Sequence, residues 1–219
     1  MSWDNIWEEK FKSSRWGEYP ESDLIRFMAR YFYNRDRASV SVLEVGCGPG
    51  PNIWYLCREG FSTKGIDGSS SGIERARKRL QLEGLEAKLT VGDIINLPYK
   101  DDSFDAVIDS KCIYCNSLEN THKILSEIKR VLKPGGYFYS TVFSDETYLG
   151  ENQTQVAENE YTNISDGVLK GMGFARLINI EGIHQLYGQY LNITSIDKID
   201  YTRHDRKDQY HEFSIICQK

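Results

Sequence analysis

The sequence lacks a long apolar run, and it lacks an even set of cysteines that could all pair in disulfides. No stretch of its 219 residues approaches about 18 consecutive apolar residues, and the first ten residues contain no apolar core of a signal peptide. The five cysteines are odd in number, which is typical of reduced thiols rather than of a disulfide framework. We therefore expect a cytoplasmic protein with no membrane partner.

An excess of positive charge is also missing. Lys and Arg number 27 against 32 Asp and Glu, which gives a formal net charge of -5. Because nucleic-acid binders obtain much of their affinity from clustered Lys and Arg on phosphates, this balance argues against a nucleic-acid partner. The composition is otherwise ordinary for a globular protein, and the length suits one domain or a core domain with a small appendage.

Two common nucleotide-binding signatures are absent from the glycine-rich stretch Val42–Gly50. No Gly-Lys-Ser/Thr of a P-loop follows it, and its glycines are spaced Gly-x-Gly-x-Gly rather than Gly-x-Gly-x-x-Gly. The stretch nevertheless follows a β-branched run and precedes a helix start. Closely spaced glycines at that place let the backbone turn and approach a ligand, and the free helix amides suit a carboxylate or phosphate.

Strands and helices alternate between residues 38 and 143. The expected strands cover 40–45, 63–67, 87–91, 104–109 and 137–143, and the expected helices cover 51–58, 70–83 and 118–132. Repeated β-α units of this length predict an α/β fold with a parallel sheet covered by helices on both faces.

The two ends of the chain follow other patterns. Before the core, residues 3–12 and the apolar residues after Pro20 predict two helices. Residues 144–173 are polar and weakly periodic, which indicates a binding loop or lid. A short segment, a helix and two strands joined by a turn then follow, at 175–180, 181–190, 192–203 and 209–217. The last two strands predict an antiparallel hairpin around a turn at 205–208.

Aspartates stand at the ends of three expected strands, at Asp67, Asp93 and Asp109. In open parallel sheets, ligands bind outside the carboxyl ends of the strands. A carboxylate at Asp67 would accept hydrogen bonds from ribose hydroxyls, and Asp93 would accept one from an adenine amino group with Ile94 against the ring. Aspartates also favour such junctions because they cap turns. Their joint placement around one glycine loop favours the ligand.

Together these motifs resemble the ordered motifs of class I S-adenosylmethionine-dependent methyltransferases. The matching segments are Leu43–Gly50, Gly65–Asp67, Gly92–Pro98, Phe104–Asp105 and Arg130–Gly136. The resemblance implies a Rossmann-like three-layer αβα sandwich. Its sheet would have seven mostly parallel strands in the order 3-2-1-4-5-7-6, with the last strand antiparallel. We expect a single methyltransferase domain over 1–219, made of a helical cap (1–37), a cofactor-binding core (38–143), a substrate lid region (144–191) and a closing β-hairpin (192–219).

The implied cofactor is S-adenosyl-L-methionine, with S-adenosyl-L-homocysteine as its product. Trp16 and Tyr19 lie in a segment that folds over the cofactor in many such enzymes, although both rings could instead fix the first helix to the core. The implied cofactor-binding residues are Trp16, Tyr19, Glu44, Gly46, Cys47, Gly48, Gly50, Asn52, Asp67, Gly68, Ser69, Asp93, Ile94, Asp109, Ser110 and Lys111.

The methyl acceptor is harder to read. We expect His184 and Tyr114 as catalytic residues, because a hydroxyl or ammonium acceptor must lose a proton. The expected substrate-binding residues are Tyr114, Asn116, Tyr148 and Tyr161. The pair Cys112 and Cys115 has no second pair to complete a zinc site, so we expect no metal and interpret both thiols as part of the acceptor pocket.

The sequence thus predicts methyl transfer to an O or N atom of a small molecule, with a sugar or sugar-like metabolite as the expected acceptor. Residues 144–163 carry several acidic side chains and no Lys or Arg, which disfavours polyanionic acceptors. A non-catalytic cofactor-binding subunit or sensor, and a methyltransferase that acts on a peptide or protein, remain the alternatives. The glycine spacing disfavours a nicotinamide oxidoreductase. We expect a monomer or homodimer.

Overall fold

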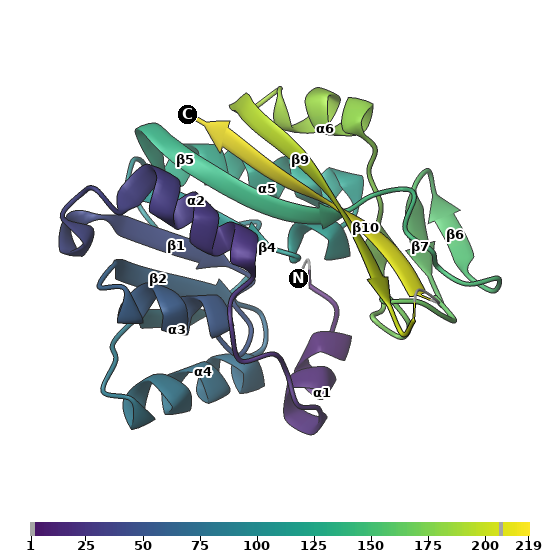
Figure 1. Ribbon diagram of the computed structural model, residues 1–219, viewed down its shortest axis with the longest axis horizontal. Helices are drawn as coiled ribbons and strands as arrows, with labels where there is room; N and C mark the ends of the chain where they lie inside the picture. The colour runs from purple at the N-terminus through teal and green to yellow at the C-terminus, as the bar shows by residue number, and fades with distance from the viewer. Residues whose placement is uncertain (1–2, 206–207) are drawn as a thin grey trace.

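The computed structural model describes residues 3–205 and 208–219, and a seven-stranded sheet forms its centre (Figure 1). The strand order is β3-β2-β1-β4-β5-β10-β9. Pairing is parallel from β3 to β5, and β10 pairs antiparallel with both β5 and β9. The predicted order and the antiparallel last strand are therefore confirmed. The strands are β1 (Ser41–Val45), β2 (Ser62–Asp67), β3 (Lys88–Val91), β4 (Phe104–Ser110), β5 (Leu132–Phe143), β9 (Asn192–Arg203) and β10 (Asp208–Gln218).

Helices cover both faces of this sheet. Adjacent residues of a strand point to opposite faces, and here both faces carry apolar side chains that must be buried. Val42 packs in one apolar cluster with side chains of α2, whereas Leu43 packs in another with side chains of α5. Figure 1 shows α2 in front of the sheet and α5 behind it. The three-layer arrangement is thus the Rossmann-like sandwich that the motifs predicted. The helices are α1 (Ile6–Ser13), α2 (Ser22–Phe32), α3 (Pro51–Arg58), α4 (Ser70–Leu82), α5 (Leu118–Val131) and α6 (Ile180–Tyr187), with short 3₁₀ turns η1 (Arg37–Ser39) and η2 (Ile113–Cys115).

A second, three-stranded antiparallel sheet lies inside the region expected to be an irregular lid loop. It consists of β6 (Thr154–Ala157), β7 (Glu160–Thr162) and β8 (Ala175–Arg176). The expectation of a loop over 144–173 was therefore wrong for β6 and β7, whereas β8 falls in the short segment expected at 175–180. Strands of two to four residues are too short to show an alternating pattern, and all of β6 is exposed.

The small sheet is fixed to the main sheet through Arg176. This side chain is buried, and its guanidinium donates hydrogen bonds to the carbonyl oxygen of Asn116 (3.3 Å) and to Oγ1 of Thr121 (3.1 Å). Asn116 lies in the loop after β4 and Thr121 lies in the first turns of α5, so the lid region is tied to the segment that follows the carboxyl end of β4. Such a tie holds the lid close to the place where ligands of this fold class bind.

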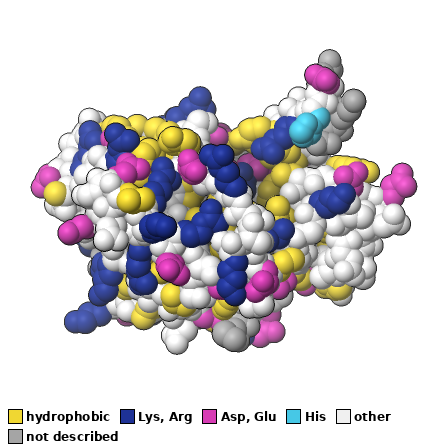
Figure 2. Space-filling view, turned by 90° about the horizontal axis from the view of Figure 1, so that it is seen from below, with side chains coloured by type: hydrophobic (Ala, Val, Ile, Leu, Met, Phe, Trp, Pro, Cys, Tyr) yellow, Lys and Arg dark blue, Asp and Glu magenta, His cyan; other side chains and the backbone are white. Residues whose placement is uncertain are grey.

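The surface and the chain ends add two observations. Figure 2 shows Lys and Arg side chains interspersed with Asp and Glu on the lower face, and the β9–β10 hairpin projecting from the body. The predicted turn at 205–208 includes positions 206 and 207, which lie outside the described residues. In the part of the chain that the structure describes, no helix has the length and apolar character needed to cross a membrane.

Candidate active site

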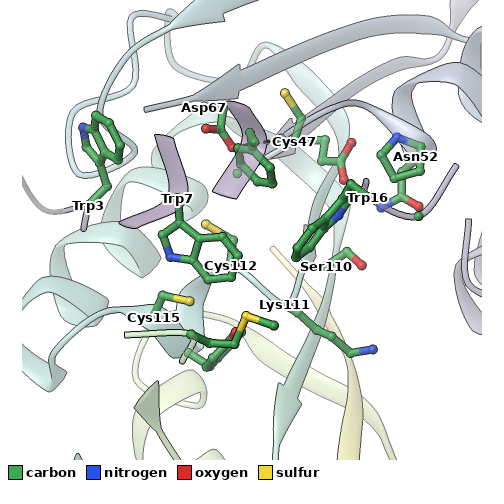
Figure 3. A pocket seen from close by; sticks show the side chains of 18 of the residues that line it. Trp3, Trp7, Trp16, Cys47, Asn52, Asp67, Ser110, Lys111, Cys112 and Cys115 are labelled. Carbon is green, nitrogen blue, oxygen red and sulfur yellow. Dashed lines mark hydrogen bonds between the residues drawn. The ribbon is translucent and has the colours of Figure 1, made fainter. Parts of the chain in front are cut away.

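A cavity of about 560 Å³ lies at the carboxyl ends of β1, β2 and β4, which is the size of a small-molecule site. Its wall combines the glycine loop, the residues after β2, β3 and β4, the N-terminal segment around α1, and part of β10. Figure 3 shows Asp67 and Cys47 on one side of this cavity, and Trp7, Cys112 and Cys115 on the other.

The glycine loop has a backbone that only glycine adopts easily. Gly46, Gly48 and Gly50 have φ angles of +67°, +49° and +79°. A Cβ on Gly46 would overlap the Cys112 side chain, and one on Gly48 would lie 3.0 Å from Cζ of Phe11. The loop therefore lets two neighbouring segments approach its backbone closely. Gly46 and Gly48 border the cavity, whereas Gly50, predicted to bind the cofactor, is the N-cap residue of α3 and packs toward α4 instead.

Asp67, at the end of β2, borders the cavity as predicted and connects two loops. Its Oδ2 accepts a hydrogen bond from the amide of Gly48 (2.8 Å), and its Oδ1 accepts one from the amide of Ser69 (2.7 Å). Burial raises the pKa of this carboxyl, and the two amides act in the opposite direction. Gly68 also borders the cavity. Ser69 does not, because its hydroxyl caps α4 through the amide of Gly72 (3.0 Å).

Glu44 is a buried carboxylate beside the glycine loop. Its Oε1 accepts a hydrogen bond from Nδ2 of Asn52 (2.7 Å), and both residues border the cavity. Its Oε2 has no hydrogen-bond partner among the described residues. Burial raises the pKa of Glu44 to about 8, and the negative charges of Asp67 and Asp109 raise it further. A buried carboxylate with one unused oxygen is suited to an ammonium group.

The residues after β3 form another part of the wall. Asp93 and Ile94 both border the cavity, as the strand-end pattern predicted. Oδ1 of Asp93 accepts a hydrogen bond from the amide of Ile95 (3.2 Å), which fixes the direction of the carboxylate. Ile94 is buried, so it presents an apolar surface next to a polar group. This combination suits a flat heterocycle with an amino group at its edge.

Asp109 has a different place from the one expected. It does not border the cavity but is fully buried behind it. Its Oδ1 accepts hydrogen bonds from the amides of Cys112 (2.9 Å) and Ile113 (3.0 Å), and Oδ2 accepts one from Oγ of Ser140 (2.6 Å). Burial raises its pKa to about 6. Asp109 thus holds the turn that brings Ser110 and Lys111 to the cavity, where both were predicted.

The wall of the cavity that contains the residues predicted to contact an acceptor is mainly apolar. Tyr114 and Asn116 border it as predicted, together with both thiols of the Cys112–Cys115 pair. The Tyr114 ring packs edge-on against Phe143, with ring centroids 4.9 Å apart. Val168, Leu169 and Met172, from the segment before β8, complete this wall.

Three predicted acceptor residues lie elsewhere. His184 is on the exposed side of α6, Tyr148 is 47% exposed, and Tyr161 is half-buried in β7. None of them borders the cavity. His184 follows a buried residue of α6, so the helix that packs on the sheet turns this imidazole outward. The geometry therefore gives no support to a role for these side chains in proton transfer or substrate contact.

The N-terminal segment supplies wall residues that motif reading missed. Trp3, Trp7 and Phe11 border the cavity beside the predicted Trp16 and Tyr19. Phe11 packs against Trp7 and Trp16, with ring centroids 5.8 and 5.2 Å away. The spacing of Trp3, Trp7 and Phe11 by four residues is the signal that predicts one helix face.

A polar contact attaches α1 to the loop after β2. The Glu8 carboxylate accepts hydrogen bonds from the hydroxyls of Ser69 and Ser71 and from the amide of Ser71 (3.2 Å). These hydrogen bonds lower the pKa of Glu8 to about 2, and the bond from Ser69 has the largest effect. The negative charge lies at the N-terminus of α4, where the helix dipole favours it.

The β9–β10 hairpin supplies three further wall residues that were not predicted, Arg203, Tyr210 and Glu212. No local sequence signal marks Glu212, because the antiparallel pairing of β10 with β5 places it opposite Phe143. Across residues 3–205 and 208–219, His, Cys, Asp and Glu form no group of three or more that could hold a metal ion.

Comparison with known proteins places the chain in a family. A family model for a methyltransferase domain matches residues 36–201. The phthiotriol/phenolphthiotriol dimycocerosates methyltransferase of Mycobacterium tuberculosis is 40% identical over 105 residues, which are 47% of this chain and 37% of that protein. Methyltransferase GfsG of Streptomyces halstedii is 36% identical over 114 residues, 50% of this chain and 40% of that protein. The chain thus matches well under half the length of these curated relatives.

Solved structures agree on the fold. A S-adenosylmethionine-dependent methyltransferase from Methanosarcina mazei superposes with a TM-score of 0.72 at 23% identity, covering 85% of this chain and 95% of that one. The 1,6-didemethyltoxoflavin-N1-methyltransferase of Burkholderia thailandensis, solved with 1,6-didemethyltoxoflavin and S-adenosylhomocysteine, gives 0.63 at 17% identity, covering 90% and 86%. The chain therefore belongs to the methyltransferase domain family, with the motifs and the sheet of the class I S-adenosylmethionine-dependent methyltransferases.

Proposed function

We propose that the protein transfers a methyl group from S-adenosyl-L-methionine to an O or N atom of a small molecule. The observation that carries this proposal is the composition of the cavity wall. One part is built from the glycine loop, Glu44, Asp67 and Asp93, and another from apolar and aromatic side chains. A polar part for a charged nucleoside and an apolar part for a second molecule are what the reaction requires.

The residues present fit the donor. The unused oxygen of Glu44, close to the glycine loop, suits the ammonium of its amino-acid end. Asp67 would accept hydrogen bonds from the ribose hydroxyls, since each of its oxygens uses one backbone amide and keeps further acceptor capacity. Asp93 and Ile94 would hold the adenine edge and face. The glycine loop would contact the donor through backbone alone, because a Cβ at Gly46 or Gly48 meets other side chains.

When bound, the sulfonium group supplies an activated methyl carbon. The chain contributes alignment and the exclusion of water, because the reaction is an in-line displacement. Trp7, Phe11 and Trp16 form a mutually packed aromatic cover over the glycine loop. Lys111 and Ser110 are held in place by the buried turn at Asp109.

The acceptor in this proposal has an apolar body with one reactive hydroxyl or amine. Tyr114, Phe143, Leu169 and Met172 supply a wall that suits such a body better than a polyol. Tyr148 and Tyr161, expected to hold a sugar, lie outside the cavity, so these side chains do not favour a sugar as the acceptor. The relatives are named for dimycocerosates and for 1,6-didemethyltoxoflavin, neither of which is a sugar by name.

Ligand-dependent melting tests the donor first. S-adenosylmethionine and S-adenosylhomocysteine at 100 times their dissociation constants would each stabilise the folded state by about 2.7 kcal/mol, and NAD would not. Stabilisation by NAD alone would contradict the proposal. Incubation with methyl-labelled donor and a panel of phenols, aliphatic alcohols and amines then tests transfer. Binding of the donor without labelled product from a metabolite extract or the panel would favour the sensor alternative.

A further inference from the structure

One buried carboxylate in the cavity wall has no role in holding the donor. Glu212, on β10, is 1% exposed and borders the cavity. It lies opposite Phe143 of β5, which belongs to the apolar wall. A buried carboxylate beside an apolar acceptor wall needs a polar partner, because burial of an unpaired charge is costly.

The partner in the chain satisfies Glu212 only in part. Nζ of Lys111 lies 2.8 Å from Oε1 of Glu212, and the same ammonium donates a hydrogen bond to Glu21. Two carboxylates therefore share one ammonium. The 2.8 Å contact with Lys111 is therefore an ion pair in which the ammonium divides its donors between Glu212 and Glu21. An ionised carboxylate has about four acceptor positions, so one ion pair leaves Glu212 able to accept a hydrogen bond from a ligand.

Lys111 fixes the position of this carboxylate relative to the donor site. It follows Ser110 in the turn after β4, and both residues border the cavity. Its φ of 55° is unusual for a residue with a side chain, and the turn that Asp109 holds imposes it. Its ammonium also lies 5.8 Å from the centroid of the Phe143 ring. The Lys111–Glu212 pair therefore lies between the turn beside the donor site and the apolar acceptor wall.

We propose that Glu212 is the general base that accepts the proton of the reacting hydroxyl or amine of the acceptor. This inference rests on the proposed function. A bond forms between the acceptor oxygen or nitrogen and the methyl carbon, and the carbon–sulfur bond breaks with its electron pair passing to sulfur. The proton of the O–H or N–H group moves to a carboxylate oxygen of Glu212. Lys111 is a positioning residue that holds this carboxylate.

The charges around Glu212 are suited to that task. Burial raises its pKa and the charge of Glu21 raises it too, while Lys111 and Arg203 lower it. A carboxylate with a raised pKa is a stronger base than an exposed one, which favours proton uptake from the acceptor. The titratable groups that interact with this cluster from the neighbouring elements are Lys111, Glu21, Arg203, Tyr139, Tyr201 and Tyr210.

The test compares Glu212→Gln with the wild-type protein, using methyl-labelled S-adenosylmethionine and the best-methylated member of a panel of phenols and aromatic amines. We expect kcat to fall on the order of 100-fold, with the acceptor KM and the S-adenosylhomocysteine affinity changed much less. The wild-type kcat should decrease as pH falls through the pKa of Glu212, and the variant should lose this decrease. Asp200→Asn removes an exposed carboxylate of β9 outside the cavity and should leave both the rate and the pH profile unchanged.

Several outcomes would overturn the inference. Retained kcat, or an unchanged acid limb of the pH profile, in Glu212→Gln shows that another group takes the proton. If that variant does not fold, Glu212→Asp replaces it and must keep the acid limb at a reduced rate. If no member of the panel is methylated, the pKa of the Glu212 carboxyl is measured by ¹³C NMR titration of the S-adenosylhomocysteine complex. Titration at its ordinary value near 4.5 overturns the inference, and titration above it is the expected result. Absence of S-adenosylhomocysteine binding contradicts the proposed function instead.

Discussion

The carboxylate of Asp67 joins the first two loops of the sheet, since its Oδ2 lies 2.8 Å from the amide nitrogen of Gly48. Its other oxygen accepts a hydrogen bond from the amide of Ser69 at 2.7 Å. One buried side chain thus fixes the glycine loop relative to the loop after β2. The same carboxylate borders the cavity, so the group proposed to bind the ribose also shapes the loop proposed to bind the amino-acid end.

Replacing Asp67 by Asn should weaken cofactor binding through both effects. The amide NH₂ of Asn would face one of the two backbone amides, so one loop contact becomes repulsive. Hydrogen bonds to charged groups contribute about 1.5–3 kcal/mol, so we expect S-adenosylhomocysteine to bind roughly 10- to 100-fold more weakly in calorimetry. Asp197→Asn, an exposed change on β9, is the matched control. Wild-type affinity in Asp67→Asn would show that the ribose lies elsewhere.

Alanine substitutions at Gly60 and Gly46 would distinguish the cost of backbone strain from the cost of steric crowding. Gly60 has a φ of +84° and nothing within 4 Å of an added Cβ, whereas at Gly46, with a φ of +67°, the Cβ would overlap the Cys112 side chain. Gly60→Ala should cost only the left-handed conformation, about 1–2 kcal/mol. Gly46→Ala should cost about 1–3 kcal/mol more, because overpacking is added. Denaturant unfolding measures the free energy of unfolding of each variant. Equal losses in the two variants would mean that the turn at Cys112 moves aside at little energetic cost.

The core of the fold could be predicted from local pattern, and the acceptor side could not. Gly46, Asp67 and Asp93 belong to short motifs whose chemistry depends on neighbours in sequence, so the sequence placed all three on the cavity correctly. Glu212 reaches the same cavity only because β10 pairs antiparallel with β5. No local signal in the sequence around Glu212 encodes that contact.

Two predicted site residues, Asp109 and His184, lie off the cavity for a reason of shorter range. Asp109 ends a strand as Asp67 does, but its oxygens accept hydrogen bonds from Cys112, Ile113 and Ser140, so it is turned away from the cavity. Aspartate caps turns in both places, and the sequence does not say which carboxylate is left facing a ligand. His184 is a similar case. The sequence predicts a helix around it but does not say which side of that helix is buried, and in α6 the His184 side chain is exposed.

The attachment of α1 should depend on pH through Glu8. Its pKa is lowered to about 2 in the folded protein, first by the hydrogen bond from Ser69. A carboxyl with a lowered folded pKa stabilises the folded state fully above its unfolded pKa, and this stabilisation is lost as pH falls through the folded value. We expect α1 to loosen between about pH 4.5 and pH 2, and fluorescence of Trp3, Trp7 and Trp16 reports it. Other carboxyls also titrate in this range, so the fluorescence change of the wild-type protein must be compared with that of Glu8→Gln. Identical pH profiles in the two proteins would contradict the Glu8 contact.

The thiols of the cavity should be inert. Burial raises the pKa of Cys112, and it raises that of Cys115 to about 12. Only the thiolate is nucleophilic, so at pH 8 roughly one Cys115 in ten thousand would be reactive. Alkylation by iodoacetamide, followed per residue by mass spectrometry, should be far slower than for free cysteine and rise about tenfold per pH unit. Rapid modification at pH 7 would instead indicate a stabilised thiolate and favour a redox role for the pair.

Glu44 should make cofactor binding release a proton. Burial, with the charges of Asp67 and Asp109, raises its pKa to about 8, so at pH 7 the carboxyl is mostly protonated before binding. An ammonium ligand favours the ionised form, so the proton must leave and the affinity should rise up to about tenfold per pH unit from pH 6 to 7. Calorimetry of S-adenosylhomocysteine in phosphate and in Tris should show close to one proton released at pH 7. Glu44→Gln has no proton to lose, so its binding heat should not vary with the buffer. A wild-type heat that is equally insensitive would place the ammonium away from Glu44.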